Sequence, residues 1–421
     1  MAAEWIWVKH RHDAWVPAKV ESRGSDGSLS CVERETSKRR TVKAESVGPA
    51  IPNIRDLITM TSDLVQMAHV NESSIIDLLK RRFKRDKCYT AIGDILIAVN
   101  PFKRLPHFTP AEIAMYRGRG TKDMQPHPYL IIDSAYNDVC ALQRNQSVLI
   151  SGESGAGKTF TVKVLLGYLA EVAGSPTQVE KKILAANPVL EAFGNAKTLR
   201  NDNSSRFGKF IEIMFERNRH QIIGCHTINY LLEKSRIANQ GPGERNFHIF
   251  YYMCDPECFS AEERAALELG NVEDYTYTSG GGCWKARTHD DHDEHADMEE
   301  GFKNLGFTPD QRKQCMELTA AVLHLGQIKF EDEGSSGSKP TGASNATIAT
   351  VARLLGVSPG PLGKGMTELV TDQFTRAFSP AKAAETRDSL CKAIYSHVRF
   401  MIFYRYYDSE LSTYLCRILF M

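Results

Sequence analysis

Residues 152–159 (GESGAGKT) combine glycines, a lysine and a threonine at a spacing suited to binding phosphate. They fit the pattern G-x-x-x-x-G-K-[ST] at every position. The glycines let the backbone turn with its N–H groups pointing inward around phosphate oxygens. Lys158 can reach the β- and γ-phosphates, and the Thr159 hydroxyl can ligate Mg²⁺. The pattern predicts a site for a nucleoside triphosphate with Mg²⁺. The residues predicted to form it are Gly152, Glu153, Ser154, Gly155, Ala156, Gly157, Lys158 and Thr159.

A second polar stretch, residues 201–210 (NDNSSRFGKF), gathers amides, hydroxyls and a guanidinium in one short loop. Such groups can hold Mg²⁺, position a water molecule and stabilise charge that develops on a γ-phosphoryl group. Turns are rich in Asn and Ser for ordinary reasons of backbone geometry. From these residues alone, a plain polar turn is therefore an equal alternative.

Alternating strands and helices must position these two loops. The apolar run 148–151 predicts a strand before the first loop, and the periodic residues of 160–173 predict a helix after it, ending at Gly174. This context argues against a chance glycine turn. Alternation over 211–215, with a turn at 218–220, predicts a hairpin, and 95–99 predicts a buried strand. Together these elements indicate an α/β core with a mixed central sheet and surrounding helices.

The chain divides into regions of different character. Short extended runs separated by turn clusters predict a small β-barrel over residues 1–48. Pro49 and Pro52 mark a connector, and the α/β region is expected over 54–421. The polar stretch 331–350, rich in Gly, Ser and Thr, is interpreted as a surface loop or flexible insert.

Composition narrows the class of protein. Lys plus Arg number 52 and Asp plus Glu number 51, so the formal net charge of +1 provides no global field for nucleic acid or an anionic membrane. The ten cysteines show no paired framework, and neither a secretory signal nor a membrane-spanning apolar run is found. We expect reduced thiols and a cytoplasmic protein that binds no nucleic acid and has no membrane span.

Two weaker patterns have ordinary interpretations. Residues 80–87 (KRRFKRDK) resemble a nuclear signal or an anionic-surface patch, but the apolar spacing of Ile75, Ile76, Leu79 and Phe83 favours a solvated helix face. Three histidines at 289, 292 and 295 lie among acidic residues. A divalent metal site is conceivable there, but a solvated acidic loop is favoured because a second ligand pair is not evident.

The pairing of GESGAGKT with NDNSSRFGKF resembles the P-loop and switch I of the myosin motor domain, here residues 152–159 and 201–210. The first 48 residues resemble the small Src-homology-type β-barrel that precedes many myosin motors. The likeness runs from about residue 5 to residue 397, with 398–421 a divergent tail. Further stretches that carry it are 91–103 (AIGDILIAVNPFK), 187–195 (NPVLEAFGN), 230–236 (YLLEKSR), 244–251 (ERNFHIFY), 321–330 (AVLHLGQIKF) and 387–396 (RDSLCKAIYS).

The resemblance implies roles for individual residues in the hydrolysis of Mg-ATP. Lys158 would hold phosphates, Thr159 and Ser205 would hold Mg²⁺, and Ser204 with Asn203 would help place the attacking water. Arg206 matches the arginine that pairs with a glutamate of switch II to close the site. The family's switch I contacts to nucleotide, metal and water map onto Asn201, Asn203, Ser204 and Ser205. The loop that holds the purine maps onto Asn100, Pro101, Arg104 and Phe108.

The sequence also departs from the family pattern. Phe108 replaces a tyrosine at the purine, and Phe160 replaces a glutamate after the P-loop threonine. The switch II string D-I-x-G-F-E is absent, so we expect an incomplete motor domain in which Arg206 is unpaired. Oriented positioning supplies most of the barrier reduction in phosphoryl transfer. We therefore expect nucleotide binding with negligible hydrolysis by this chain, and no light chains on it.

Three classes of function remain open at this point. The first is the ATP-binding part of an actin-based cytoskeletal motor, with actin filaments as the partner that the resemblance implies. The second is a nucleotide-binding or interaction module without turnover. The third is another P-loop enzyme, such as a small-molecule kinase, which the 201–210 stretch disfavours.

Overall fold

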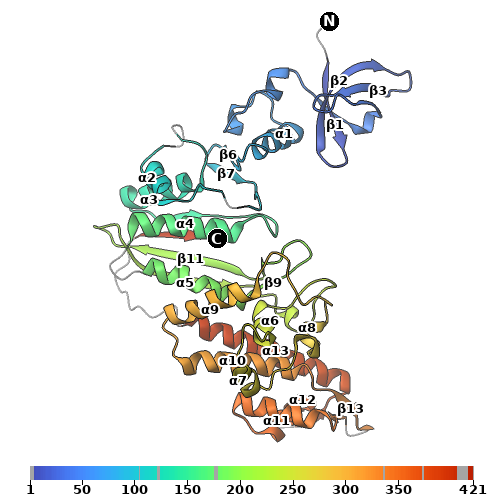
Figure 1. Cartoon of the computed structure of the whole chain (residues 1–421), viewed down its shortest axis with the longest axis vertical. Helices are drawn as coiled ribbons and strands as arrows, with labels where there is room; N and C mark the ends of the chain where they lie inside the picture. The colour runs from blue at the N-terminus through green and yellow to red at the C-terminus, as the bar shows by residue number, and fades with distance from the viewer. Residues whose placement is uncertain are drawn as a thin grey trace. The chain divides into compact units, whose positions relative to one another are not determined.

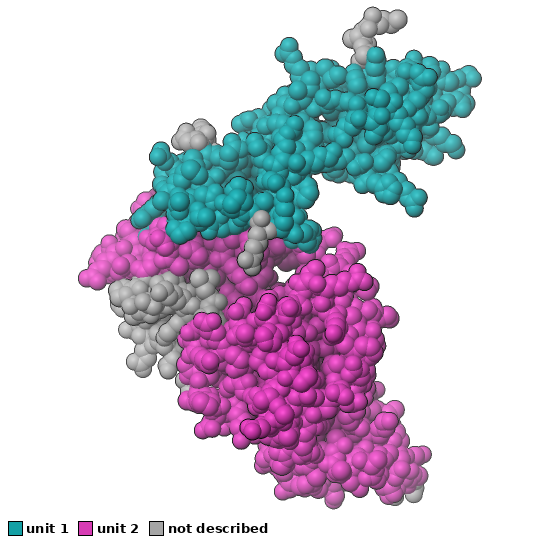
Figure 2. Space-filling model, viewed as in Figure 1, with its two compact units in different colours: residues 1–137 teal, residues 138–421 magenta. Residues whose placement is uncertain are grey.

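The computed structural model describes residues 4–103, 105–120, 124–174, 179–334, 337–371, 374–404 and 416–420. The chain forms two compact units, residues 1–137 (unit 1) and 138–421 (unit 2) (Figure 2). Each unit has a hydrophobic core of its own.

Unit 1 begins with a five-stranded antiparallel sheet in the order β4-β3-β2-β1-β5 (Figure 1). Its strands are β1 (Trp5–His10), β2 (Ala14–Arg23), β3 (Leu29–Glu33), β4 (Arg39–Val42) and β5 (Val47–Ala50). Alternate side chains point to one face. They form the core of Ile6, Val8, Ala18, Leu29, Cys31 and Val42. The predicted strands are confirmed, and the sheet extends past residue 48 because Ala50 pairs with Ile6. Closure into a barrel stays a prediction.

Short helices and one hairpin complete unit 1. They are η1 (Ala44–Ser46), η2 (Ile54–Leu57), η3 (Leu64–Gln66), α1 (Glu72–Phe83), β6 (Tyr89–Ile92), β7 (Ile95–Ala98), α2 (Pro110–Tyr116) and the start of α3 (Pro128–Leu142). The prediction of a buried strand at 95–99 was wrong about burial, since Ile95 is 65% exposed. A two-stranded hairpin such as β6–β7 has too few neighbours to cover both of its faces.

The predicted apolar face of α1 was wrong at the C-terminal end of the helix, whereas Leu78 is buried and Ile75, Ile76 and Leu79 are half-buried. Phe83 is exposed, whereas Arg82 is buried and donates to the Thr90 hydroxyl and to two backbone carbonyls. Other cations of the 80–87 run form ion pairs within the unit. These pairs are Lys80–Asp13, Arg81–Asp77 and Lys84–Glu35. The basic run therefore serves the internal structure of unit 1.

Unit 2 is built on a four-stranded mixed sheet in the order β12-β11-β17-β8. Its strands are β8 (Gln146–Val148), β11 (Gly208–Phe215), β12 (Ile222–Tyr230) and β17 (Cys416–Phe420). The hairpin of β11 and β12 confirms the prediction, and β17 runs parallel to β8 and antiparallel to β11. The strand predicted at 148–151 lies earlier, because Leu149 is already 71% exposed in the loop that follows β8.

Most of the helices of unit 2 lie to one side of this sheet and form the large core of the unit with one another (Figure 1). The longer ones are α4 (Lys158–Ala173), α5 (Val179–Ala192), α9 (Asp291–Asn304), α10 (Pro309–Leu325), α11 (Ser344–Leu355) and α13 (Pro380–Tyr404). The shorter ones are η4 (Lys234–Ile237), α6 (His248–Cys254), α7 (Ala261–Ala266), η5 (Val272–Asp274), α8 (Thr276–Ser279) and α12 (Pro359–Thr367). Helix α5 packs against α4, β12 and α9, and α13 packs against α10.

Small two-stranded pieces complete unit 2. They are β9 (Asn195–Ala196) with β10 (Ser204–Ser205), β13 (Phe330–Asp332) with β14 (Ser338–Pro340), and β15 (Glu368–Val370) with β16 (Thr375–Ala377). The interpretation of 331–350 as a loop was wrong for most of that stretch, since it contains β14 and the start of α11. Ser344 begins α11 and is buried, with its hydroxyl bonded to Lys329 and Thr341.

Two predictions about the whole chain are tested by the described residues. The cysteines among them are free thiols. None of the described helices is both long enough and apolar enough to cross a membrane.

Candidate functional site

The loop at 152–159 connects β8 to α4 and takes its shape from glycine. Gly155 and Gly157 have φ angles of +82° and +93°, which residues with a side chain rarely adopt. Gly157 is the N-cap of α4, so the helix begins at Lys158. The first N–H groups of a helix have no partner within it and attract anions. The Lys158 amine donates to the carbonyl oxygens of Gly152 and Glu153, at 2.6 and 3.0 Å, and so lies over the same loop.

The loop at 201–206 meets the first loop through two pairs of hydroxyl groups. Thr159 Oγ1 lies 3.0 Å from Ser205 Oγ, and Ser154 Oγ lies 2.8 Å from Ser204 Oγ. The structure therefore brings together two segments that the sequence separates, as predicted. Paired hydroxyls at the start of a helix are oxygen ligands of the type that Mg²⁺ accepts.

Asn203 is held from behind the loop by buried polar groups. Its amide nitrogen donates to Glu191 Oε2 at 3.3 Å. Its amide oxygen accepts from Asn195 Nδ2 at 2.8 Å and lies 3.2 Å from His248 Nε2. Glu191, Asn195 and His248 are each less than 10% exposed. Such a network restricts Asn203 to one orientation.

The charges behind this loop compensate one another. Burial alone raises the pKa of Glu191, but the ammonium groups of Lys163 and Lys209 outweigh it, and the net shift is downward. Lys163 Nζ lies 2.7 Å from Glu191 Oε1. Burial lowers the pKa of Lys209 to about 8, against the opposing effect of Glu191. Glu191 is therefore ionised at neutral pH and can only accept hydrogen bonds.

Arg206 is paired, which corrects the expectation of an unpartnered guanidinium. Its Nε donates to Glu233 Oε2 at 2.7 Å, and its Nη1 donates to Ser204 Oγ at 3.2 Å. Glu233 also accepts from Arg236 at 2.8 Å. Burial raises the pKa of Glu233, but the hydrogen bonds from Arg236 and Arg206 lower it further than burial raises it. The expectation failed because Glu233 lies in a separate stretch, 230–236.

Asp202 anchors the other end of the loop. Its carboxylate accepts from the backbone N–H groups of Arg287 and Thr288, at 2.7 and 2.9 Å, and from the Thr288 hydroxyl. Burial raises its pKa, but these hydrogen bonds and Lys197 outweigh burial and lower it. The loop is thus fixed at both ends by contacts with distant residues.

The residues predicted at the purine lie in unit 1, apart from Arg104, which is outside the described residues. Asn100 Oδ1 accepts from the backbone N–H of Phe102 at 2.9 Å. Phe108 packs against the rings of His127 and Tyr129, at centroid distances of 5.4 and 6.3 Å. The purine roles of Asn100, Pro101, Arg104 and Phe108 stay predictions. Phe160, at the start of α4, is 51% exposed.

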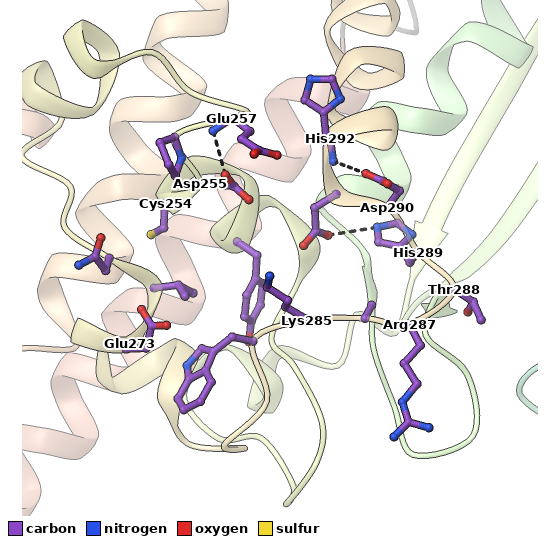
Figure 3. Close-up of a pocket in the computed structure, with 17 residues that line it drawn as sticks. Cys254, Asp255, Glu257, Glu273, Lys285, Arg287, Thr288, His289, Asp290 and His292 are labelled. Atoms are coloured by element: carbon purple, nitrogen blue, oxygen red, sulfur yellow. Dashed lines mark hydrogen bonds and ion pairs between the residues drawn. The ribbon is translucent and has the colours of Figure 1, made fainter.

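A cavity of about 660 Å³ lies elsewhere in unit 2, between the end of α6 and residues 284–292 (Figure 3). Its wall includes His289, Asp290, Asp291 and His292. The interpretation of these residues as a solvated acidic loop was wrong for His289 and for the secondary structure, although the side chains of His292 and Asp293 are exposed. Residues 291–295 begin α9, capped by Asp290, and His289 is only 7% exposed. Histidine and acidic residues alternate in the sequence, and that pattern alone does not show which of them turn inward.

Sequence reasoning missed four residues that shape the 201–206 loop. They are Glu191, Asn195, Glu233 and His248. All four lie in the stretches 187–195, 230–236 and 244–251, which had already been singled out for their likeness to the motor family. The sequence therefore pointed to these three stretches, but it did not show that their side chains bond to the 201–206 loop.

Comparison with known proteins now identifies the family. The model of the myosin head (motor domain) matches residues 61–410. The chain is 40% identical to the high molecular weight form of myosin-1 of Acanthamoeba castellanii over 409 residues, which are 94% of this chain and 25% of that protein. It is 36% identical to human unconventional myosin-Vc over 403 residues, which are 93% of this chain and 23% of that protein. The chain therefore belongs to the myosin head family and spans about a quarter of the length of these relatives. The match continues past residue 397, where the divergent tail had been expected to begin.

Proposed function

We propose that this chain binds Mg-ATP between residues 152–159 and 201–206, as the nucleotide-binding part of an actin-based cytoskeletal motor. The observation that carries the proposal is the 3.0 Å approach of Thr159 Oγ1 to Ser205 Oγ beside the N-terminus of α4. Two hydroxyl oxygens from different segments can bind one Mg²⁺, while the helix start and Lys158 bind the phosphates.

The same contact between the two loops supports the roles that we propose for the individual residues. Lys158 and the loop N–H groups hold phosphates, and Thr159 and Ser205 hold Mg²⁺. Asn203 and Ser204 help place a water molecule near the γ-phosphate. Arg206 joins the loop to Glu233, so it stabilises the position of Ser204 and Ser205. Actin filaments as the partner, and a cytoplasmic, cytoskeletal location, are proposed from family membership.

The decisive experiment measures binding of a fluorescent ATP analogue to the purified chain, with and without Mg²⁺. We expect Mg²⁺ to increase affinity at least tenfold, and Thr159→Ala to remove that increase. Thr161→Ala is the matched control, because Thr161 lies in the same helix and its hydroxyl donates to the Gly157 carbonyl. Equal affinity with and without Mg²⁺ would contradict the metal roles, and no binding at all would contradict the site.

The actin proposal has its own test, which is co-sedimentation of the chain with actin filaments. We expect ATP to weaken that binding. Co-sedimentation that is the same with and without ATP would separate the filament contact from the nucleotide site.

A further inference from the structure

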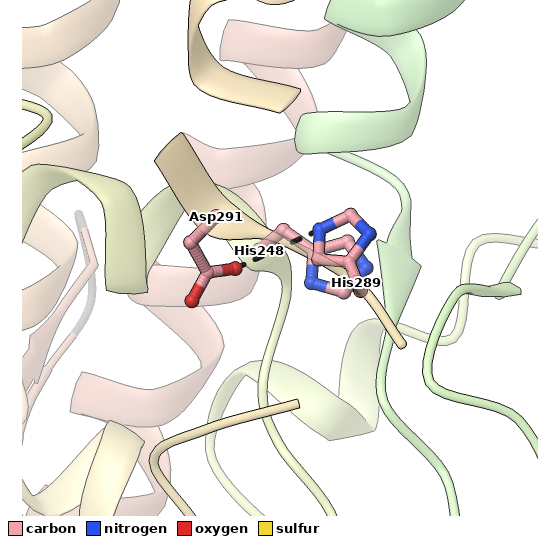
Figure 4. A group of neighbouring side chains, drawn as sticks. All are labelled: His248, His289 and Asp291. Atoms are coloured by element: carbon pink, nitrogen blue, oxygen red, sulfur yellow. Dashed lines mark ion pairs between the residues drawn. The ribbon is translucent and has the colours of Figure 1, made fainter. Parts of the chain in front are cut away.

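We propose that His248, His289 and Asp291 form a binding site for a divalent transition metal such as Zn²⁺. One ring nitrogen from each histidine and one carboxylate oxygen lie within 4.8 Å of one another. Figure 4 shows the two imidazole rings stacked, with the Asp291 carboxylate beside them. Two imidazoles and a carboxylate form a donor set typical of Zn²⁺, Co²⁺ or Fe²⁺, whereas Mg²⁺ prefers oxygen ligands. This inference does not rest on the proposed nucleotide site.

Hydrogen bonds determine which nitrogen of His248 is free for a metal. Glu191 is ionised and can only accept, so the amide NH₂ of Asn203 faces it. The amide oxygen of Asn203 therefore faces His248, and Nε2 of His248 carries the proton. Nδ1 of His248 is then a bare acceptor. His248 is fully buried, and this nitrogen has no hydrogen-bond partner among the residues that the structure describes.

An unsatisfied buried acceptor destabilises the fold and is rare in native structures, so its presence calls for an explanation. A metal ion would supply the missing partner. Metal-binding histidines usually donate their other ring N–H to a neighbouring oxygen, and the bond from His248 to Asn203 has this form.

The surroundings permit entry of an ion and set its affinity. His289 and Asp291 also line the 660 Å³ cavity shown in Figure 3, which provides a path from solvent. Arg245 binds both oxygens of Asp291, at 2.9 and 3.0 Å, and its charge opposes a cation. Each carboxylate oxygen has two lone pairs, so Asp291 can accept Arg245 and a metal together. We expect weaker binding than in a structural zinc site.

At least one ring must rotate to bind the ion. The ring centroids are 3.9 Å apart and the ring planes differ by 18°, so the in-plane lone pairs of the stacked rings do not converge on one point. His289 Nε2 lies 3.6 Å from Asp291 Oδ1 and 2.9 Å from the Tyr252 hydroxyl oxygen. Metal binding therefore requires the His289 imidazole to rotate and give up its contact with Tyr252, because ligand atoms around a tetrahedral Zn²⁺ are about 3.4 Å apart and all point at the ion.

The test titrates the chelator-treated full chain with Co²⁺, followed by visible absorption, and with Zn²⁺, followed by calorimetry. We expect one Co²⁺ per chain, displaced by Zn²⁺ and not by excess Mg²⁺. His289→Cys and His289→Ser form a matched pair that differs in one atom. The cysteine variant should keep Zn²⁺ and show a new sulfur-to-cobalt charge-transfer band, and the serine variant should bind at least tenfold more weakly.

His292→Gln is the control, because His292 follows Asp291 in α9 and its side chain is 60% exposed. It should bind metal like the unmodified chain. The proposal is overturned if the unmodified chain binds no Zn²⁺, if His289→Ser binds as tightly as the unmodified chain, or if His292→Gln abolishes binding. Because the first outcome needs no variant, a variant that fails to fold leaves the test intact.

Discussion

The two loops that meet at Thr159 and Ser205 owe their shapes to different causes. Residues 152–159 are shaped by their own glycines and by the start of α4. Residues 201–206 are shaped by side chains from elsewhere, namely Glu191, Glu233 and His248, and by the backbone at 287–288. The first loop is therefore defined locally and the second by the tertiary structure. Substitutions should separate the two cases.

The largest effect is expected from Lys158→Ala in the locally defined loop. Loss of a charge-assisted contact to phosphate should lower ATP affinity roughly 100-fold. The unfolding free energy should change by less than about 0.5 kcal/mol, because the partners of the amine among the described residues are two exposed loop carbonyls. A binding titration and a urea denaturation curve measure the two quantities. Lys313→Ala, on an exposed face of α10, should change neither.

Glu233→Gln should act on the fold instead. It removes a charge shared by two guanidinium groups. Arg236, which is only 5% exposed, keeps its second carboxylate partner, Glu244, at 2.9 Å. We expect a loss of about 2 kcal/mol in unfolding free energy, below the full cost for a buried pair because Glu233 is partly exposed. Glu216→Gln removes a looser surface pair, 4.0 Å from Arg219, and should cost little. If the two variants lost the same unfolding free energy, the contact with Glu233 would not be what holds the 201–206 loop in place.

The same ion pairs predict a pH dependence. The folded state lowers the pKa of Glu233 below the ordinary value of 4.5, so its charge stabilises the fold above that pH. The stabilisation is lost as the pH falls through the folded-state pKa. The difference in stability between the unmodified chain and Glu233→Gln should therefore be constant near neutral pH and shrink below about pH 4.5. If the difference in stability stayed constant down to low pH, the Glu233→Gln effect would come from packing and not from the charge of Glu233.

Asp202→Asn should have a smaller effect. The amide keeps one acceptor but loses the charge that faces Lys197 and the donors at 287–288. We expect a loss of about 1 kcal/mol and faster hydrogen exchange at the amides of Arg287 and Thr288. Asp293→Asn, whose carboxylate is 85% exposed, is the control. Unchanged exchange at 287–288 would show that Asp202 does not anchor the loop.

Gly155→Ala should have an effect similar in size to that of Asp202→Asn. An added Cβ would lie 3.8 Å from Asn201 Cβ, so it fits, and only the φ of +82° opposes it. The cost should be about 1 kcal/mol. Gly167→Ala, in the interior of α4 and in open space, should instead stabilise by about 1 kcal/mol. Thermal melts should show a lower melting temperature for Gly155→Ala and a higher one for Gly167→Ala. If both variants melted at a lower temperature, the positive φ of Gly155 would not explain its effect.

This contrast explains which features could be predicted from the sequence. The 152–159 loop, the helix after it and the hairpin of β11 and β12 follow from local pattern, and all were found near their predicted positions. Arg206 was misjudged because its partner Glu233 comes from another segment. The face of α1 was misjudged because a buried arginine satisfied by backbone carbonyls leaves no periodic signal. His289 was misjudged because a histidine among acids looks the same whether it is exposed or stacked on His248.

The position of β17 has a consequence for the order in which the molecule is assembled. Ile418 pairs with Gln146 on one side and with Ile213 on the other, and in the described sheet β8 has no neighbour except β17. Pairings between segments so distant along the chain form slowly, because a long loop must close first. We therefore expect the strand that leads into GESGAGKT to stay without a paired neighbour during translation until the ribosome has released residues 416–420. Until then β8 presents a free edge to chaperones and to other nascent chains.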